Sequence, residues 1–411
     1  MQIAVQYDLL LHQMDVKSAY LHAPIDEEIY VNQPAGYVTP NKVWRLNKSL
    51  YGLKQSGRNW HQTLNSYLKE QGFDQSTADP CVFIKHESND VTILLVWVDD
   101  IIIATNTTDL MSDIKSKLSL KFRMKDLGEL SSFLGIKFQQ SKEKVTMSQE
   151  HYLRNVLKSF GMEDCKPRST PCEPNLKSYE ESNAEIKDIT DYRRMVGTLI
   201  YAMTCTRPDL AYTVTKLSQH LSCPTSADWA MLKHVFRYIK QSVAYKLTFT
   251  KSSNLKINAF CDADWASSLQ DRHSISGYVI SLNENGPPIS WKSKKQSSVA
   301  LSTCEAEYMA LSLTCQEAVY LTRLLNELLP TNLPPVIIKN DNQGALALVK
   351  NPVKHTKSKH IDIRYHYVRE CYNENKINLD YVQSSKNIAD IFTKPPKKYF
   401  LREFGQFLFG Q

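Results

Sequence analysis

Two adjacent aspartates, Asp99 and Asp100, interrupt an otherwise aliphatic stretch of the chain, LLVWVDDIII at residues 94–103. Moving an isolated carboxylate out of water costs on the order of several kcal/mol even after the protein relaxes around it. Along one continuous strand the two side chains would point to opposite faces, so a buried strand could not solvate both. A tight turn between VTILLVWV and IIIAT removes this conflict. The sequence therefore predicts a hairpin whose tip presents both carboxylates.

A third aspartate, Asp15, ends another apolar stretch, LLLHQMDV at residues 9–16. Aspartate is common in turns, so Asp99 and Asp100 need no function to explain them. Three carboxylates together would instead supply the hard oxygen ligands that divalent cations of the magnesium kind prefer. Two such cations about 4 Å apart can stabilise both the attacking and the leaving oxygen of a phosphoryl transfer. The third aspartate favours the metal site over a simple turn.

Length, net charge, cysteine count and apolar runs set broad limits on the class of protein. A length of 411 residues predicts two or three domains, and a formal charge of +7 suits a polyanionic partner without requiring one. Nine cysteines lie singly without a CxxC pair, which argues against a disulfide framework or a zinc ribbon and indicates a reducing compartment. No apolar run approaches the roughly 18 residues of a membrane span, and no signal peptide follows Met1, so we expect a soluble intracellular protein.

The pattern of apolar residues divides the chain into regions. Strand-like and helical stretches alternate up to about residue 136, and the Pro- and Ser-rich stretch 165–185 predicts a surface connection. Residues 190–243 carry apolar side chains at three- and four-residue spacing, which predicts helices. After Ser253 three short strands, a long amphipathic helix, a strand, a helix, a strand and a short helix follow. That order predicts an independent α/β domain.

Four long segments carry a resemblance to a known family. They are QMDVKSAYLHAPIDEEIYVNQPAGY, VWRLNKSLYGLKQSGRNWH, LLVWVDDIIIAT and FRMKDLGELSSFLGIKF, and they resemble, in order and spacing, the reverse transcriptase segments of copia-type retrotransposon Pol proteins. The resemblance continues through YRRMVGTLIYAMTCTRPDLAY to the C-terminus. It implies an α/β protein made of an α+β reverse transcriptase palm with only a remnant of fingers (1–140), a helical thumb and connection (141–250), a ribonuclease H-like α/β domain (254–400) and a C-terminal tail (401–411).

The resemblance implies that Asp15, Asp99 and Asp100 hold two magnesium ions, with manganese as an alternative. One ion would lower the pKa of a primer 3′-hydroxyl, and the other would neutralise the triphosphate and the leaving pyrophosphate. Tyr20 falls at the family's steric gate, where an aromatic ring excludes a ribose 2′-hydroxyl. An ordinary core aromatic is the alternative for Tyr20.

Further residues of these segments have implied roles. In SLYGLKQS, Gly52 would let the backbone approach template or nucleotide closely, and Lys54 would contact phosphate. A plain glycine turn and a solvated lysine are the alternatives. FLGI at residues 133–136 resembles the primer grip, with a simple hairpin as the alternative.

A second set of acids lies in the C-terminal region, at two strand ends, in the long helix and in the terminal helix. Such positions can converge on one edge of a sheet in this topology. The segments resemble the ribonuclease H domain that follows reverse transcriptase in copia-type elements, which implies two-metal hydrolysis of the RNA strand of an RNA–DNA hybrid. The implied catalytic and metal-binding residues are Asp262, Glu307, Asp341 and Asp390.

Neighbouring acids compete for these roles. Ser302 and Glu305 fit a capping box at the start of the long helix, and Glu305 does not share a helix face with Glu307. Glu307 is therefore the expected ligand, while Asp262 is preferred to Asp264 because it matches the family motif.

The basic segment KHTKSKHIDIRYHYVRE at 354–370 lacks a compact metal-ligand spacing in its histidines His355, His360 and His366. Either it contacts the phosphates of the hybrid or it is a solvated charge run.

Some features depart from the family pattern. Trp97 replaces the usual tyrosine before VDD, and Gly57 stands where many members have proline. Because Met1 lies only 14 residues before Asp15, the resemblance predicts that most of the fingers, which grip the incoming triphosphate, are absent.

The expected partners are an RNA template, a DNA primer, an RNA–DNA hybrid and deoxynucleoside triphosphates, without a membrane. We expect a protein of the cytoplasm, inside a virus-like particle, and of the nucleus, and not a secreted one. The leading hypothesis is an RNA-directed DNA polymerase fused to a ribonuclease H. The alternatives are a catalytically silent remnant that binds nucleic acid and a chain in which only the ribonuclease H is active.

Overall fold

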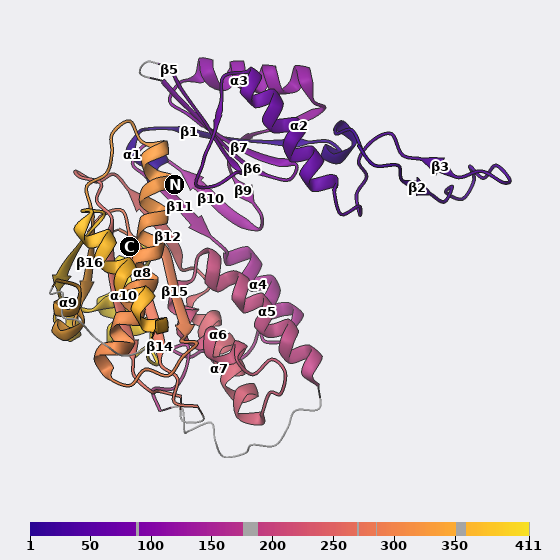
Figure 1. The fold of residues 1–411 in the computed structure, drawn as a ribbon. Helices are drawn as coiled ribbons and strands as arrows, with labels where there is room; N and C mark the ends of the chain where they lie inside the picture. The colour runs from indigo at the N-terminus through magenta and orange to yellow at the C-terminus, as the bar shows by residue number, and fades with distance from the viewer. Residues whose placement is uncertain (88–89, 176–187, 269–270, 285, 351–358, 411) are drawn as a thin grey trace. The chain divides into compact units, whose positions relative to one another are not determined.

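The computed structural model describes residues 1–87, 90–175, 188–268, 271–284, 286–350 and 359–410 (Figure 1). The chain forms two compact units. One comprises Gln6–Leu130 with Glu327–Pro330, and the other comprises Met1–Val5, Ser131–Asn326 and Thr331–Gln411. Helices and sheets occur in both units, which confirms the predicted α/β class. Within the residues described, no helix has the length and apolar character needed to cross a bilayer. None of the nine cysteines, all of which are described, forms a disulfide.

A six-stranded sheet is the centre of the first unit. Its order is β4-β5-β6-β7-β1-β8, and neighbouring strands are antiparallel throughout. The hairpin predicted from LLVWVDDIII is present, because β6 and β7 pair as far as Trp97 and Asp100 around a turn at Val98 and Asp99. The strands are β1 (Leu10–Val16), β4 (Asp74–Gln75), β5 (Val82–Glu87), β6 (Asp90–Trp97), β7 (Asp100–Thr105) and β8 (Met124–Glu129).

Two helices, α2 (Ser56–Glu70) and α3 (Thr108–Lys121), pack against this sheet. Helix α2 buries Trp60, Leu64 and Leu68 at four-residue spacing, which places them on one helix face. These side chains share a core with residues of β1 and β7. The helices therefore anchor the two strands that carry the aspartates.

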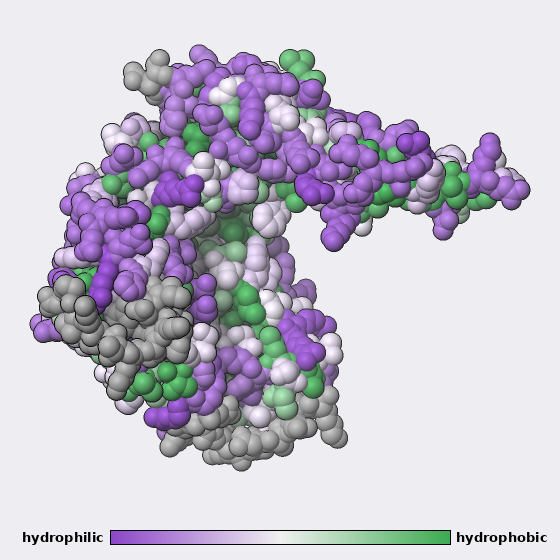
Figure 2. All heavy atoms as spheres, viewed as in Figure 1, coloured by the Kyte–Doolittle hydropathy of each residue, from purple (hydrophilic) through white to green (hydrophobic). Residues whose placement is uncertain are grey.

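A two-stranded ribbon of β2 (Tyr30–Val31) and β3 (Trp44–Arg45) extends away from the six-stranded sheet (Figure 1). Apolar side chains are exposed along it, and Tyr37 packs edge-on against Trp44 with ring centroids 6.4 Å apart. Figure 2 shows hydrophobic residues interspersed with hydrophilic ones over this segment. The short 3-10 helix η1 (Ala19–His22) follows β1.

A four-stranded antiparallel sheet of order β12-β11-β10-β9 belongs to the second unit. The predicted domain boundary at residue 140 falls inside this sheet, between β10 and β11. FLGI forms the β9–β10 turn, where Leu134 and Gly135 both have positive φ, as a two-residue hairpin of type I′ requires. The elements are α1 (Gln2–Gln6), which precedes them along the chain, then β9 (Ser132–Phe133), β10 (Ile136–Gln140), β11 (Lys144–Ser148) and β12 (Lys246–Thr250).

A helical block follows, as predicted for residues 190–243. Its helices share one apolar core to which each contributes, including Leu153, Leu199, Leu217 and Val235. Of the predicted connection 165–185, residues 176–185 lie outside the described part of the chain. The helices are α4 (Glu150–Ser159), α5 (Ile189–Cys205), η3 (Pro208–Leu210), α6 (Ala211–Ser218) and α7 (Ser226–Ser242).

A fully buried ion pair, Arg207 with Asp209, ties this block together. The guanidinium donates to both carboxylate oxygens of Asp209, at 2.9 and 2.6 Å. Tyr238 of α7 donates its hydroxyl to the same carboxylate at 2.7 Å, and Ser242 accepts from Arg207 through its carbonyl and its hydroxyl. Buried charges are tolerated when they are paired and hydrogen-bonded in this way.

The C-terminal domain is built on a five-stranded sheet of order β15-β14-β13-β16-β17. Strands β13, β16 and β17 are parallel to one another, while β14 and β15 run antiparallel to their neighbours. The strands are β13 (Asn258–Asp264), β14 (Ile275–Ser281), β15 (Pro288–Lys295), β16 (Val336–Asn340) and β17 (Ile377–Tyr381). This sheet and its helices agree with the α/β domain predicted from the order of the elements.

Two details of this domain differ from the prediction. The structure has two helices between β16 and β17, α9 (Gln343–Lys350) and α10 (Lys359–Asn373), where one was predicted. The predicted tail 401–411 is largely helical, as the end of α11 (Lys398–Glu403) and all of α12 (Gly405–Phe409). The three last side chains of α12 are apolar and buried, so packing holds this end in place. The long helix is α8 (Thr303–Leu328).

Replacing Arg207 by Met would leave Asp209 buried without its partner. We expect the free energy of unfolding of the second unit to fall by about 3–5 kcal/mol, the usual effect of breaking a buried pair. Arg154→Met is the matched control, because Arg154 pairs with Glu150 at 2.7 Å on the surface of α4. That change should cost about 0–1 kcal/mol. Urea unfolding of both variants measures the difference, and equal losses would contradict a structural role for the buried pair.

Candidate functional site

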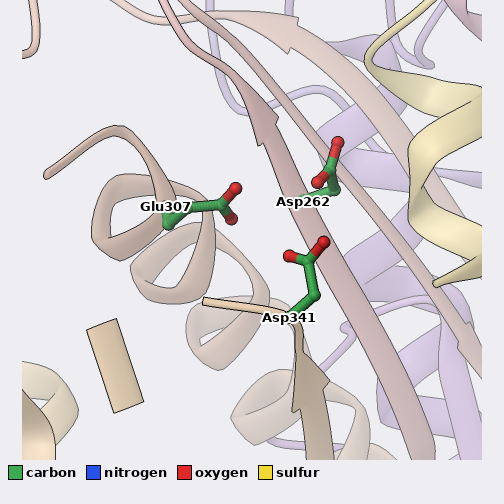
Figure 3. A group of neighbouring side chains, drawn as sticks. All are labelled: Asp262, Glu307 and Asp341. Atoms are coloured by element: carbon green, nitrogen blue, oxygen red, sulfur yellow. The ribbon is translucent and has the colours of Figure 1, made fainter. Parts of the chain in front are cut away.

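Three acidic side chains of the second unit converge on one point (Figure 3). Asp262 lies in β13, Glu307 near the start of α8, and Asp341 directly after β16. One oxygen from each lies within 4.8 Å of the other two. Asp262 and Glu307 are buried, and Asp341 is half-buried. Because β13 and β16 are parallel neighbours, both bring their acid towards the same edge of the sheet.

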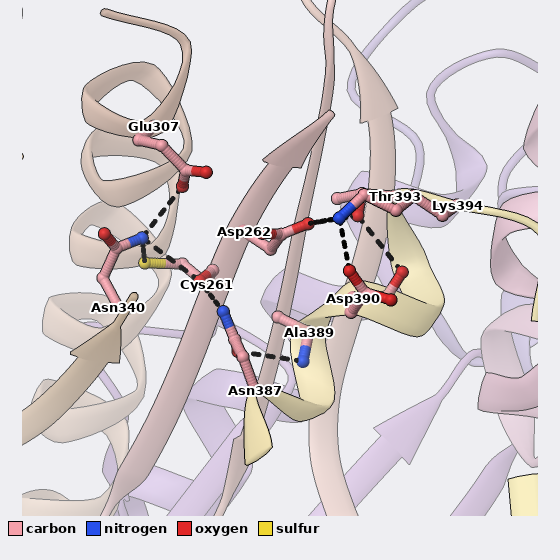
Figure 4. A network of polar contacts seen from close by, with 9 residues as sticks. All are labelled: Cys261, Asp262, Glu307, Asn340, Asn387, Ala389, Asp390, Thr393 and Lys394. Carbon is pink, nitrogen blue, oxygen red and sulfur yellow. Dashed lines mark hydrogen bonds and ion pairs between the residues drawn. The ribbon is translucent and has the colours of Figure 1, made fainter. Parts of the chain in front are cut away.

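A neutral amide holds the Glu307 carboxylate in place. Asn340, the fully buried last residue of β16, donates through Nδ2 to Glu307 Oε2 at 3.0 Å and to the carbonyl oxygen of Cys261 at 3.2 Å (Figure 4). Its Oδ1 accepts from the backbone N–H of Asn342 at 2.9 Å. Asn387 donates to the same Cys261 carbonyl at 2.9 Å. The carboxylate is therefore oriented by a donor that carries no charge.

Asp390 lies next to Asp262 but outside the group of three. It belongs to the 3-10 helix η5 (Ile388–Phe392), where the sequence predicted a short terminal helix. Lys394 forms an ion pair with Asp390 and places its Nζ 3.8 Å from Asp262 Oδ2. The Thr393 hydroxyl donates to the same Asp262 oxygen (Figure 4). Lys394 thus links the fourth acid, Asp390, to Asp262.

A glycine in β14 allows η5 to approach the sheet this closely. Gly277 pairs with Asp262, and a Cβ at Gly277 would lie 2.7 Å from Cβ of Phe392 and 2.8 Å from Cγ2 of Thr393. Contacts that short do not occur between carbon atoms, so any side chain here would push η5 away. The position of Asp390 and Lys394 depends on this absent side chain.

The structure places the competing acids elsewhere. Ser302 Oγ accepts from the backbone N–H of Glu305 at 3.1 Å, as in the capping interaction expected at the start of α8. The Glu305 carboxylate accepts from the N–H of Leu301 at 2.8 Å rather than facing Asp262. Asp264 is half-buried and outside the group of three.

Burial makes these acids hard to ionise without a cation. Desolvation raises the pKa of Glu307 to about 9, with Asp262 as the next cause. Desolvation also raises the pKa of Asp262 to about 6, although Lys394 and the Thr393 hydroxyl act in the opposite direction. Like charges in a buried setting oppose each other's ionisation. A group of carboxylate oxygens of this kind fits a hard divalent cation.

In the first unit, the β6–β7 turn holds the paired aspartates. Val98 has a φ of 57°, which is rare for a β-branched residue and costs on the order of 1–3 kcal/mol. Trp60 Nε1 donates to the Val98 carbonyl at 2.6 Å, and the Val16 N–H donates to the Asp99 carbonyl at 2.7 Å. These bonds from α2 and β1 fix the strained turn.

Asp15 and Asp100 are direct cross-strand partners in β1 and β7, with Asp99 next to them in the turn. Gln13 Nε2 donates to Asp100 Oδ1 at 3.1 Å. Burial raises the pKa of Asp100, and Asp99 and Asp15 raise it further, while the Gln13 bond lowers it. Within the described residues, these three carboxylates do not converge as closely as the group around Asp262.

The other residues predicted in this unit lie near the turn or on the surface. Tyr20 is half-buried, and its ring lies 4.4 Å from that of Tyr51 between centroids. Gly52 has a φ of 97°, a turn conformation that suits glycine, and Lys54 is exposed. Trp97, the partner of Asp100, is 57% exposed.

The predicted basic segment lies partly outside the described residues. His355 lies outside them, and the side chain of His360 is not described either. His366 lies exposed on α10.

Sequence reasoning missed the residues that hold the acids. Asn340 and Gln13 show no pattern along the chain, because their partners come from other elements. Lys394 could have been found, since it lies four residues after Asp390 and such pairs meet on a helical turn. Tyr51 lies within SLYGLKQS, next to the predicted Gly52, but its contact with Tyr20 depends on the tertiary fold.

Comparison with known proteins gives consistent matches. The family model described as reverse transcriptase (RNA-dependent DNA polymerase) matches residues 1–174. A retrovirus-related Pol polyprotein from transposon TNT 1-94 of Nicotiana tabacum is 38% identical over 417 residues, which cover 98% of this chain and 31% of that protein. The chain thus spans about a third of the tobacco relative.

Two further matches bear on the family and on the fold. The putative transposon Ty5-1 protein of Saccharomyces cerevisiae is 32% identical over 309 residues, covering 74% of this chain and all of that protein. A foamy viral protease-reverse transcriptase, solved with dsDNA, matches with a TM-score of 0.52 at 11% identity, over 93% of this chain and 70% of that one, and so bears on the fold alone. From the relatives' identity and coverage, the chain belongs to the retrotransposon Pol family, as the sequence predicted, and its residues 1–174 correspond to the reverse transcriptase of that family.

Proposed function

We propose that this chain hydrolyses the RNA strand of RNA–DNA hybrids at Asp262, Glu307, Asp341 and Asp390. The observation that carries the proposal is the convergence of three of these carboxylates within 4.8 Å, two of them buried and one half-buried. Two buried acids with raised pKa values have no evident structural purpose, because they destabilise the folded chain at neutral pH. A divalent cation would remove that penalty.

The donor set fits magnesium, with manganese as the alternative, since all the ligand atoms are carboxylate oxygens. Cations bound there would lower the pKa of the attacking water or hydroxyl and neutralise the charge on the leaving oxygen. The chain itself supplies orientation: Asn340 fixes Glu307, and the Thr393 hydroxyl fixes one oxygen of Asp262. Asp262 and Glu307 are only 3% and 7% exposed, so little water reaches these two acids.

We also propose RNA-directed DNA synthesis at Asp15, Asp99 and Asp100. The specific observation in favour is the turn that sets Asp99 beside the cross-strand pair of Asp15 and Asp100. Gln13 orients Asp100 as Asn340 orients Glu307, again through a neutral amide. Tyr20, half-buried and packed against Tyr51, is the proposed gate against a ribose 2′-hydroxyl.

The proposed partners follow from these reactions: an RNA template, a DNA primer, the RNA–DNA hybrid and deoxynucleoside triphosphates, with Gly52 and Lys54 near template or phosphate. Two other functions are outcomes of the tests below. They are a chain that only binds nucleic acid and a chain with ribonuclease H activity alone.

Glu307→Gln should abolish cleavage of a labelled RNA–DNA hybrid in magnesium. We expect a loss of more than about 100-fold, beyond the range typical of residues that act only by orienting a ligand. Glu305→Gln is the matched control, because Glu305 lies two residues away and caps the helix. It should keep activity near that of the unchanged chain. Full cleavage by Glu307→Gln would exclude this site, and no cleavage by the unchanged chain with hybrid binding retained would favour a binding function.

Asp99→Asn should abolish primer extension on an RNA template and leave hybrid cleavage unchanged, because the two sets of acids belong to different units. Asp109→Asn, an exposed residue of α3, is the control and should keep both activities. The measurement is the length of the extended primer on a gel. Extension that survives Asp99→Asn would contradict the proposed polymerase site, and absent extension with normal cleavage in the unchanged chain would leave the ribonuclease H alone.

The stability of the ion-free chain should depend on pH through Glu307. The pKa of the Glu307 carboxyl is about 9 in the folded state, against an ordinary value of 4.5, so the folded chain keeps this proton to a higher pH. Stability is therefore greatest below the ordinary pKa and falls as pH rises towards the folded one. Between about pH 5 and pH 8 we expect a loss of roughly 4 kcal/mol.

Thermal unfolding in EDTA and in magnesium measures this effect. Magnesium should flatten the decline by binding the folded site, and Glu307→Gln should flatten it without magnesium. Glu305→Gln should keep the slope of the unchanged chain. An equal decline in the Glu307→Gln variant would show that Glu307 is not the buried acid responsible.

A further inference from the structure

The polar groups on the two sides of Asp262 differ in charge. Figure 4 shows Glu307 with Asn340 on one side and Asp390 with Lys394 on the other. On the Glu307 side, Asn340 supplies a neutral donor. On the Asp390 side, the Lys394 ammonium supplies a full positive charge to both Asp390 and Asp262.

Lys394 stands where a cation shared by Asp262 and Asp390 would bind. Its Nζ contacts Asp390 Oδ1 and lies 3.8 Å from Asp262 Oδ2, so it bridges carboxylates from β13 and η5. The negative charge of Asp264, two residues further along β13, also stabilises the Lys394 ammonium. An ammonium and a divalent ion cannot occupy this place together, because both need the same oxygens and repel each other.

The lysine is able to leave, whereas the acids are not. Its side chain is 44% exposed, against 4% for Asp262 and 23% for Asp390. A lysine has a long flexible stem that can carry its ammonium into water while the stem stays on the protein surface. The backbone N–H groups of Asp390 and Thr393 donate to the carbonyls of Asn387 and Asp390, and the side chains of Phe392 and Thr393 pack closely on Gly277.

We propose that Lys394 is an internal cation that must be displaced before a second divalent ion binds between Asp262 and Asp390. At rest the site takes one ion, held by Asp262, Glu307 and Asp341, and the second ion enters only in exchange for the ammonium. This inference rests on the proposed ribonuclease H function, since it assigns how that same site is loaded. Lys394 therefore controls the affinity for the second ion and leaves the affinity for the first unchanged.

Counting bound Mn²⁺ by electron paramagnetic resonance tests the exchange without measuring activity. The full chain is used with Asp15, Asp99 and Asp100 all changed to Asn, so that the other set of acids does not contribute. We expect one tightly bound ion and a second bound at least about tenfold more weakly. Lys394→Met, which keeps the stem and removes the charge, should tighten the second ion by about tenfold and leave the first unchanged.

Three further variants make the result specific. Lys394→Arg keeps a positive charge and should keep the weak second site. Adding Asp390→Asn to Lys394→Met should remove the gain, because the second ion then lacks a ligand. Lys398→Met removes an exposed positive charge four residues further on and should change neither ion.

The outcomes separate the inference from the proposed function. If Glu307→Gln in the same background loses no tightly bound ion, the proposed metal site is wrong and the exchange falls with it. If Glu307→Gln loses the first ion while Lys394→Met leaves the second unchanged, only the exchange is overturned. An unchanged first ion in Lys394→Met also shows that the variant is folded, so a negative result counts against the inference.

Discussion

Both candidate sites depend on concentrating negative charge at the ends of apolar strands. Asp15 and Asp100 lie at adjoining ends of β1 and β7, and Asp262 and Asp341 are brought to one edge by β13 and β16. Burial then makes each set costly, as the raised pKa values of Asp100 and Glu307 indicate. The surrounding packing must be rigid enough to keep the acids together against their repulsion.

That rigidity has a different source at each site. At the β6–β7 turn, a strained Val98 is held by a bond from Trp60, a side chain buried in the core under the sheet. Around Asp262, the absence of a side chain at Gly277 lets η5 pack on the sheet, and Asn387 bonds the Cys261 carbonyl. The β6–β7 turn thus contains backbone strain at Val98 that hydrogen bonds hold in place, whereas the site around Asp262 depends on close packing at Gly277.

Much of the fold could be predicted because its signals are local. The aliphatic runs on either side of Asp99 and Asp100, the apolar spacing in α8 and the Ser302–Glu305 cap are each formed by residues close together in the sequence. Helix α9 was missed because it has only eight residues and follows a strand directly, which is too short for a period to show. The C-terminal helix α12 was missed because its helical form depends on burying its apolar end rather than on its own sequence.

The acids could likewise be predicted from the ends of strands, but the groups that hold them could not. Gln13 and Asn340 are neutral amides, so neither adds a cation beside the acid that it orients. A lysine in either place would pair with the acid and compete with a divalent ion for the same oxygens. Lys394 is the exception, and it stands beside Asp390, the acid that does not join the group of three. The difference between an amide and an ammonium therefore divides the site into a part ready for a cation and a part that already holds one.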